Sequence, residues 1–290
     1  MDDKRIISFD WVVKRMLRNK ANFAVLEGLF KVLIGRDMRI EEILESEGNQ
    51  QDATDKFNRV DVMAKDQNGD IIIVEVQVTR QIHYLERIPY GVSKAITEHI
   101  ALGDDYEKVK KVYSINILYF NFGEGSDYLY HGTTQFTGVH THDTLSISSR
   151  ENSVVTLTTP ADIFPEYFII RVNEFNQVAT TPLEEWLDYL KNQHISPDTK
   201  APGLQEARQR LEVMTMPDDE RLAYEHHLQN LMLEKDAIST AYDDAYMDMA
   251  IKMVNNGEDP QKIFEYTGIE PASQLLLKGR KPTRGTKRSE

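Results

Sequence analysis

The sequence of 290 residues contains no cysteine. Disulfide bonds and thiolate zinc sites are therefore excluded, which suits the reducing conditions of the cytoplasm. No apolar run is long enough to cross a membrane, and the charged residues 1–5 are not followed by the apolar stretch of a signal peptide. We expect a soluble, cytoplasmic protein without a membrane partner.

Positive charge is scarce, because 47 Asp and Glu against 34 Lys and Arg give a net charge of -13. Such a chain as a whole repels phosphate, and phosphate contact dominates nucleic-acid binding. The charge is uneven, however. Residues 1–39 hold nine bases and five acids, whereas residues 204–250 hold eleven acids and four bases. We therefore expect any nucleic-acid contact outside the acidic C-terminal part.

The pattern of the chain changes near residue 176. Before it, strands alternate with helices; after it, apolar residues recur at helical spacing, with helices predicted over 218–235 and 237–255. We predict an α/β domain over residues 1–176, a helical region over 177–277 and a basic disordered tail over 278–290. The acidic helices lack phosphate-binding chemistry, which favours docking or a homodimer through them.

Two predicted strands carry acidic residues among positions that are otherwise apolar. In the first, residues 59–64, alternation separates Asp61 from the valines on either side of it. In the second, residues 70–79, Glu75 and Gln77 share one face. The second strand is apolar on both faces before Glu75, which indicates a central strand of a sheet.

The sequence Asp-Gln-Asn-Gly-Asp at 66–70 predicts a hairpin between these strands. A two-residue loop would place Val76 opposite Asp61. A three-residue loop, with Gly69 in the left-handed conformation of a G1 bulge, places Glu75 opposite Asp61 instead. We favour the second register, because it also matches the apolar residues of the two strands.

Opposed carboxylates repel each other unless a cation lies between them. Asp61 and Glu75 offer only oxygen ligands, which favours Mg²⁺ or Mn²⁺ over Zn²⁺. The alternative is an ion pair between Asp61 and Arg59 or a distant Lys, with Glu75 a solvated strand residue. The strand pattern by itself leaves both interpretations open.

Five segments, two of which contain Asp61 and Glu75, follow one another in the order that is typical of one protein family. They are Asn-Arg-Val-Asp at 58–61, Ile-Val-Glu-Val-Gln at 73–77, Arg-Ile-Pro-Tyr-Gly-Val-Ser-Lys at 87–94, Lys-Val-Tyr-Ser-Ile-Asn-Ile-Leu-Tyr-Phe at 111–120 and Tyr-His-Gly-Thr at 130–133. The chain resembles the PD-(D/E)XK nuclease superfamily, and more narrowly the Rpn family of recombination-promoting, transposase-like nucleases. This resemblance covers most of residues 8–235.

The resemblance implies a restriction-endonuclease-like αβββαβ core with a mixed sheet, extended by a β-hairpin and by the C-terminal helices. It also implies a bacterial-type, Mg²⁺-dependent DNA endonuclease that hydrolyses phosphodiester bonds. Asp61, Glu75 and the backbone carbonyl of Val76 would hold the metal. DNA is then the expected partner.

The chain departs from the superfamily at the third motif, where the usual lysine is Gln77. Gln77 can position a water or a phosphate, but it supplies no charge. The predicted helix over 81–102 places Arg87 and Lys94 on one face, so that either can supply the missing cation. The alternative is that Arg87 and Lys94 lie on a solvated helix face and have no role at the site. A catalytically impaired nuclease fold, acting as a DNA-binding or protein-interaction module in transposition, is the alternative function.

The predicted helix over 23–34 carries Glu27 within its apolar stripe. A buried carboxylate needs a partner. In the superfamily an acid on the first helix often helps to hold the metal, so the resemblance implies Glu27 as a further metal ligand. The alternatives are a core partner for Glu27, Asp10 as the helix acid, and Glu45 or Glu47 at the rim of the site.

Overall fold

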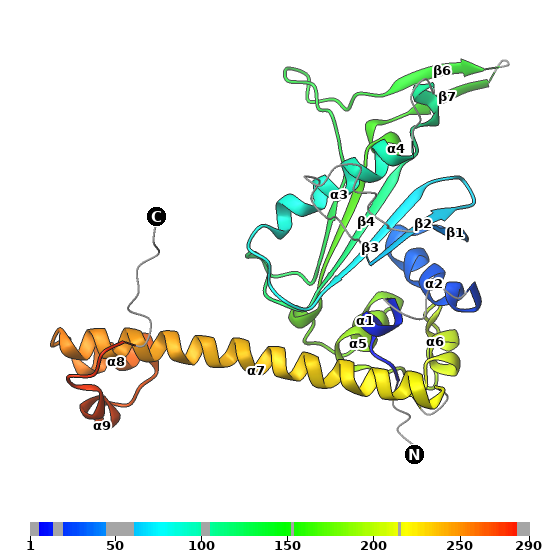
Figure 1. Cartoon of the computed structure of the whole chain (residues 1–290). Helices are drawn as coiled ribbons and strands as arrows, with labels where there is room; N and C mark the ends of the chain where they lie inside the picture. The colour runs from blue at the N-terminus through cyan, green and yellow to red at the C-terminus, as the bar shows by residue number, and fades with distance from the viewer. Residues whose placement is uncertain are drawn as a thin grey trace. The chain divides into compact units, whose positions relative to one another are not determined.

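A mixed sheet of six strands is the centre of the first of two units, which cover Met1–Met216 and Pro217–Glu290. The computed structural model in Figure 1 describes residues 6–13, 20–44, 61–99, 105–151, 154–213 and 216–282. The strand order is β1-β2-β3-β4-β8-β5. The bounds are β1 Ile40–Leu44, β2 Val62–Asp66, β3 Ile71–Gln77, β4 Val112–Leu118, β8 Glu166–Arg171 and β5 Leu129–Gly132.

Strand β2 runs antiparallel to its neighbours β1 and β3. Strands β3, β4 and β8 are parallel, and β5 is antiparallel to β8. The central strands β3 and β4 are buried along their whole length except at Gln77. Their runs of Val and Ile explain this position, because a parallel strand covered on both faces needs apolar side chains on both. The expected central strand is confirmed.

Helices cover both faces of the sheet (Figure 1). On one face, α3 (Tyr84–Glu98) packs through Val92 and Ala95 against Met63, Ile71 and Ile73. On the other side, α2 (Phe23–Ile34) lies beside the sheet, and α5 (Pro182–Asn192) and α6 (Leu204–Arg210) pack against α2. The short helix α1 (Phe9–Trp11) belongs to the same layer. The order α2-β1-β2-β3-α3-β4 is the expected αβββαβ core.

The remaining elements of the first unit are short. A separate hairpin of β6 (Ile147–Glu151) and β7 (Val154–Thr158) is the expected elaboration. Short helical turns are η2 Lys20–Asn22, η3 Tyr106–Lys108, α4 Pro160–Ile163 and η4 Val172–Glu174.

Helices α5 and α6 complete the helical layer around the N-terminus. The ring of Trp186 lies 5.9 Å from that of Phe9, edge to face, and the hydroxyl of Tyr189 donates to the carbonyl of Ile7 at 2.9 Å. A Cβ at Gly28 would lie 2.3 Å from the carbonyl carbon of Pro202, so only glycine allows this approach. The boundary that we expected at residue 176 therefore falls inside a compact unit, and the division lies after Met216.

The second unit is built on one helix of 38 residues, α7 (Asp218–Asn255), where we expected two helices. Its C-terminal end packs through Ala250 and Ile251 against α8 (Pro260–Thr267) and η6 (Leu275–Leu277), and α9 (Pro271–Gln274) joins these two. Apart from residue 241, side chains 232–247 are exposed, including several large apolar ones. A homodimer through this stretch stays a prediction.

The expected tail over 278–290 begins in an ordered contact, because Asn255 bonds the backbone of Gly279 and Arg280. Residues 283–290 lie outside the described residues. None of the helices in the described ranges is long and apolar enough to span a membrane.

A shortened chain that ends at Met216 is expected to keep a cooperative thermal transition, whereas one that ends at Asn176 is not. The second chain lacks α5 and α6, and removal of a buried Trp such as Trp186 alone costs about 3–5 kcal/mol. A domain has only about 5–15 kcal/mol of stability to lose. Circular dichroism on heating checks this, and cooperative melting of the chain that ends at Asn176 would contradict the new boundary.

The same shortened chains test the pairing of α7. We expect the full chain to sediment as a dimer and the chain that ends at Met216 as a monomer, because only the full chain carries the exposed apolar residues of α7. Sedimentation velocity makes the comparison. A full chain that is monomeric at tens of micromolar would exclude a stable dimer.

Candidate active site

The hairpin between β2 and β3 sets the geometry of the candidate site. The strands pair in the register Val62 with Val74 and Lys65 with Ile71. In the turn, Gly69 has a φ of 81° and donates its N–H to the carbonyl of Asp66 at 2.9 Å. The left-handed conformation favours glycine. The predicted three-residue loop is confirmed, and the same register extended by one residue places Asp61 opposite Glu75.

The alternation of hydrogen-bonded and non-hydrogen-bonded pairs along the strands also brings the backbone of Val76 close to Asp61. The N–H of Asp66 bonds the carbonyl of Asp70, so Asp61 and Glu75 form a non-hydrogen-bonded pair, whose Cα atoms typically lie about 4.5 Å apart. The N–H of Val76 donates to Oδ2 of Asp61 at 2.7 Å. In this pattern the carbonyl of Val76 also points toward the β2 side of β3. Two carboxylates and one backbone carbonyl therefore converge.

Glu75 is only 4% exposed. Burial raises the pKa of its carboxyl, and Asp61 raises it further, whereas Arg87 and the Tyr84 hydroxyl lower it. The Tyr84 hydroxyl lies 3.2 Å from Oε2 of Glu75, and Nε of Arg87 lies 3.6 Å from the same oxygen. A cation close to the two carboxylates would favour the charged form of Glu75.

Gln77 is linked to Arg87 through one further glutamine. Nε2 of Gln81 donates to Oε1 of Gln77 at 3.3 Å, and Nη1 of Arg87 donates to Oε1 of Gln81 at 3.2 Å. Lys94 lies two turns further along α3, about 10 Å at 1.5 Å per residue, and pairs with Glu98 at 3.6 Å. Of the two cations that we considered, the structure brings Arg87 to Glu75 and not Lys94.

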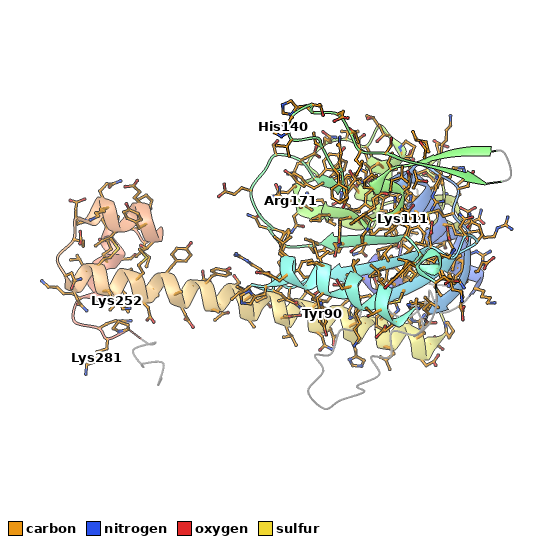
Figure 2. All side chains as sticks on the ribbon, turned by 90° about the horizontal axis from the view of Figure 1, so that it is seen from above. Tyr90, Lys111, His140, Arg171, Lys252 and Lys281 are labelled. Atoms are coloured by element: carbon orange, nitrogen blue, oxygen red, sulfur yellow. The ribbon has the colours of Figure 1, made fainter. Side chains whose placement is uncertain are left out.

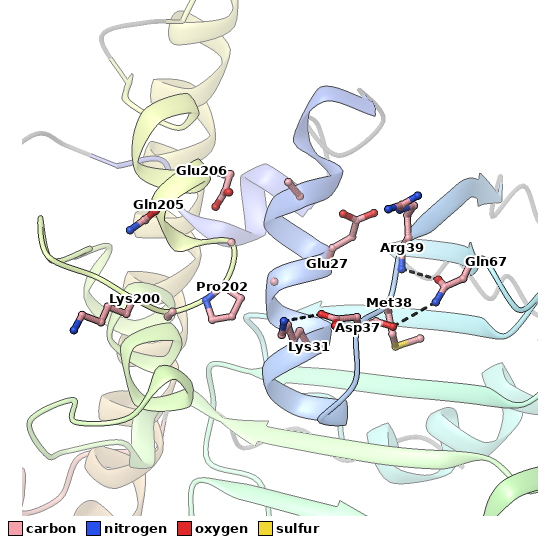
Figure 3. A pocket seen from close by; sticks show the side chains of 14 residues that line it. Glu27, Lys31, Asp37, Met38, Arg39, Gln67, Lys200, Pro202, Gln205 and Glu206 are labelled. Carbon is pink, nitrogen blue, oxygen red and sulfur yellow. Dashed lines mark hydrogen bonds and ion pairs between the residues drawn. The ribbon is translucent and has the colours of Figure 1, made fainter.

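Glu27 lies at the other end of β2. Its Oε1 accepts the N–H of Ile40, which pairs with Asp66. Asp66 is five residues from Asp61 in an extended strand, a separation of about 16 Å. Glu27 lines a cleft of about 840 Å³ together with Arg39 and Gln67. Figure 3 shows these three side chains. The expectation that Glu27 helps to hold the metal is therefore not supported by its position, and its partner is a backbone group.

Asp10, the competing helix acid, is a buried residue of α1 near the phenol of Tyr119. Burial raises the pKa of the Tyr119 phenol, and the negative charge of Asp10 raises it further. The N–H of Tyr119 bonds the carbonyl of Gln77 at 2.9 Å. Asp10 is buried, and the Tyr119 hydroxyl near it donates to the carbonyl of Leu190 in α5 at 2.9 Å. Ser8, the N-cap residue of α1, makes no side-chain cap hydrogen bond.

The donor set suits a metal that keeps water ligands. Within the described residues no three His, Cys, Asp or Glu side chains cluster as a metal site, so a closed cage of protein ligands is absent there. Mg²⁺ is usually bound by one or two carboxylates, with waters and substrate phosphates as further ligands. Asp61, Glu75 and the Val76 carbonyl fit that requirement. Glu45, Glu47 and residues 58–60 lie outside the described residues.

Arg171 holds the loop between β4 and β5. Arg171 is buried, and its Nη1 donates to the carbonyls of Gly125 and Asp127 at 2.9 and 3.3 Å. Arg171, which is labelled in Figure 2, is the last residue of β8. The preceding rings of Phe120 and Phe122 pack against α3 through Tyr84. This loop therefore forms part of the wall around the ring of Tyr84.

The first half of the chain matches a known protein family. Residues 7–150 match the family described as PD-(D/E)XK nuclease family transposase. This part of the chain is a nuclease domain of the PD-(D/E)XK transposase family. The comparison with curated proteins gave no match, nor did that with solved structures. The matched segment contains Asp61, Glu75 and Gln77 and ends before β8, the fifth strand of the sheet.

Sequence reasoning missed two residues of this PD-(D/E)XK site. Gln81 follows Gln77 by four residues in the turn before α3, and a glutamine there gave no signal of its own. Asn116 had a signal, because its polar side chain interrupts the apolar alternation of β4. The parallel register of β3 and β4 pairs Asn116 with Glu75.

Replacement of Glu75 by glutamine is expected to raise the stability of the metal-free protein near pH 7. A pKa that is raised in the folded state stabilises the fold below the unfolded value, and this contribution is lost as the pH rises through the folded value. Glutamine is neutral at every pH, so the Glu75→Gln protein keeps this stabilising contribution when the pH rises. The expected gain grows as the pH rises from 4 to 8, because only the wild-type protein loses this contribution.

Urea unfolding of Glu75→Gln and wild type between pH 4 and 8 measures this difference. The gain should be smallest near pH 4, where most of the carboxyl is protonated in the unfolded state as well. The exposed Glu86 provides the matched control, since Glu86→Gln removes a solvated charge. A Glu75→Gln protein that is less stable than wild type at pH 7 would show that the ion pair with Arg87 outweighs burial.

Proposed function

We propose that this domain hydrolyses DNA phosphodiester bonds with Mg²⁺ or Mn²⁺ bound at Asp61, Glu75 and the Val76 carbonyl. The observation that supports it most is the hairpin register, which sets two carboxylates against each other with one backbone carbonyl beside them. The family description supports a nuclease, and the narrower likeness to the Rpn nucleases makes DNA the substrate of choice. The cytoplasm is the proposed compartment.

The residues around the metal position have separate tasks in this proposal. Mg²⁺, when bound, supplies a Lewis acid and lowers the pKa of a bound water. Gln77 accepts a hydrogen bond from Gln81 at its oxygen, so its amide nitrogen is the group that donates to the phosphate or the water. An amide cannot take up a proton at neutral pH. Gln77 therefore orients the reacting groups and is not the general base.

Arg87 takes the electrostatic role of the missing lysine. A guanidinium stays charged at every relevant pH, so Arg87 stabilises developing negative charge without exchanging a proton. Its contacts with Gln81 and Glu75 hold it at the site.

Asp61→Ala and Glu75→Ala are each expected to abolish cleavage while the protein stays folded. The loss should be about a thousandfold or more, because a lost metal removes several kcal/mol of transition-state stabilisation. Nicking of supercoiled DNA in Mg²⁺, Mn²⁺ or EDTA measures it. Glu27→Gln is the matched control and should keep wild-type activity.

Cleavage that survives in either alanine variant would exclude the assigned metal ligands. A wild-type protein that binds DNA but never cleaves it, with either metal, would favour the non-catalytic module instead.

Arg87→Met is expected to lower kcat about a hundredfold, the usual effect of removing one preorganised donor from a developing charge. Lys94→Met should change kcat by less than about twofold, because Lys94 lies two turns away. Single-turnover cleavage at saturating metal makes the comparison. The double variant Arg87→Met with Gln77→Lys should recover activity, since it returns a cation to the third motif. Equal losses in the Arg87 and Lys94 variants would contradict the assignment.

A further inference from the structure

A row of buried polar side chains lies behind Glu75, on the sheet face that α3 covers. Ser114 and Asn116 of β4 are 3% and 1% exposed, whereas Val112 and Leu118 on the same face are apolar. A buried polar group in an apolar layer is unfavourable unless hydrogen bonds satisfy it. The bonds that satisfy this row lead to Glu75.

The hydrogen bonds fix the direction of each polar group. Nδ2 of Asn116 donates to Oγ of Ser114 at 3.1 Å and to the carbonyl of Phe168 at 3.3 Å. This turns Oδ1 of Asn116 toward Tyr84, whose hydroxyl lies 2.9 Å from it. The same hydroxyl lies 3.2 Å from Oε2 of Glu75. The phenol therefore stands between a neutral acceptor and a carboxylate.

Packing holds the phenol ring in place. Tyr84 is the first residue of α3 and is fully buried. The rings of Phe120 and Phe122 meet it edge to face, with centroids at 6.2 and 5.8 Å. A ring enclosed in this way cannot move its hydroxyl away from Glu75 without disturbing the core.

The hydroxyl has one proton for two acceptors. A hydrogen bond to a charged acceptor is roughly twice as strong as one to a neutral acceptor, so Tyr84 donates to Glu75 when the carboxylate is charged. Tyr84 and Arg87 both contact Oε2 of Glu75. Across the residues that the structure describes, no hydrogen bond reaches Oε1 of Glu75, which is therefore the oxygen left for a metal.

We propose that Tyr84 is a positioning residue whose hydroxyl, kept in place by the packing of its ring against the two phenylalanines, fixes the Glu75 carboxylate with Oε1 toward the metal. This role rests on the proposed function, in which Glu75 is a metal ligand. Groups that orient metal ligands typically change metal affinity by 10- to 100-fold when they are removed.

The test is Mn²⁺ binding to the full chain without DNA, measured by electron paramagnetic resonance. Tyr84→Phe should raise the Kd about tenfold, at the lower end of the range for such groups. The matched control is Tyr189→Phe. Tyr189 is also fully buried, and its hydroxyl donates to a backbone carbonyl at 2.9 Å. Both variants should lose thermal stability to a similar extent, but only Tyr84→Phe should change the Kd.

A double-variant cycle shows whether Tyr84 acts through Glu75. In the Glu75→Gln background, Tyr84→Phe should have little further effect on the Kd, because the carboxylate that it positions is gone. If Tyr84→Phe does not fold, Tyr84→Met deletes the same hydroxyl, and its flexible side chain fills the space. The same rise in Kd is then expected.

The Kd values distinguish a failure of the positioning role of Tyr84 from a failure of the proposed metal site. Equal Kd values for wild type and Tyr84→Phe overturn the positioning role even if the protein cleaves DNA. A full additional loss in the Glu75→Gln background also overturns it, because Tyr84 would then act independently of Glu75. No Mn²⁺ binding by wild type overturns the metal site and, with it, the positioning role.

Discussion

The turn at Asp66 fixes the register on which the candidate site depends. Asp66 is fully buried, and its Oδ1 accepts the N–H groups of Asn68 at 2.9 Å and Asp70 at 2.8 Å. Side chains alternate with a period of two, so a slip of one residue would move Glu75 to the opposite face of the sheet. Arg36 ties the same turn to the end of α2 by bonding Asp70 at 2.7 Å. The chemistry at one end of the hairpin is therefore set at the other end.

The core of the fold and the acid pair were predictable because they follow from local rules. The period of two, the Val and Ile content of β3 and the demand for glycine at Gly69 all act over a few residues. The choices that failed depend on long-range packing. Glu27 shares a helical stripe with core residues, and that stripe does not reveal which end of the sheet it faces.

The same limit explains the wrong boundary at residue 176 and the two helices expected in place of α7. Composition changes at 176, but α5 and α6 bury their apolar faces against the N-terminal segment, which composition cannot show. Nothing in the sequence between 235 and 237 breaks the helix, and helical propensity alone carries α7 across it. The sequence also made Arg87 and Lys94 equal candidates for the cation at the site. Only the direction of α3 along the sheet shows that Arg87 lies at Glu75 and Lys94 does not.

The site also shows how an acidic protein can hold a local cation. Charges further apart than about 10 Å are largely screened at moderate salt. The net charge of -13 therefore matters less at Glu75 than the guanidinium 3.6 Å away. A strand lysine would carry its charge on a flexible stem, whereas Arg87 projects from a helix and is braced by Gln81. The position of the charge thus depends on the packing of α3.

The bond between Tyr189 and Ile7 joins residues that are 182 positions apart in the sequence. A ribosome adds roughly 5–20 residues per second, so about ten to forty seconds separate the synthesis of these two partners. Strands β1 to β4 are made during that interval, together with α3, which covers one face of the sheet. The apolar surface that α5 buries stays open to water until α5 is made, and a chaperone or slow translation would protect it from aggregation.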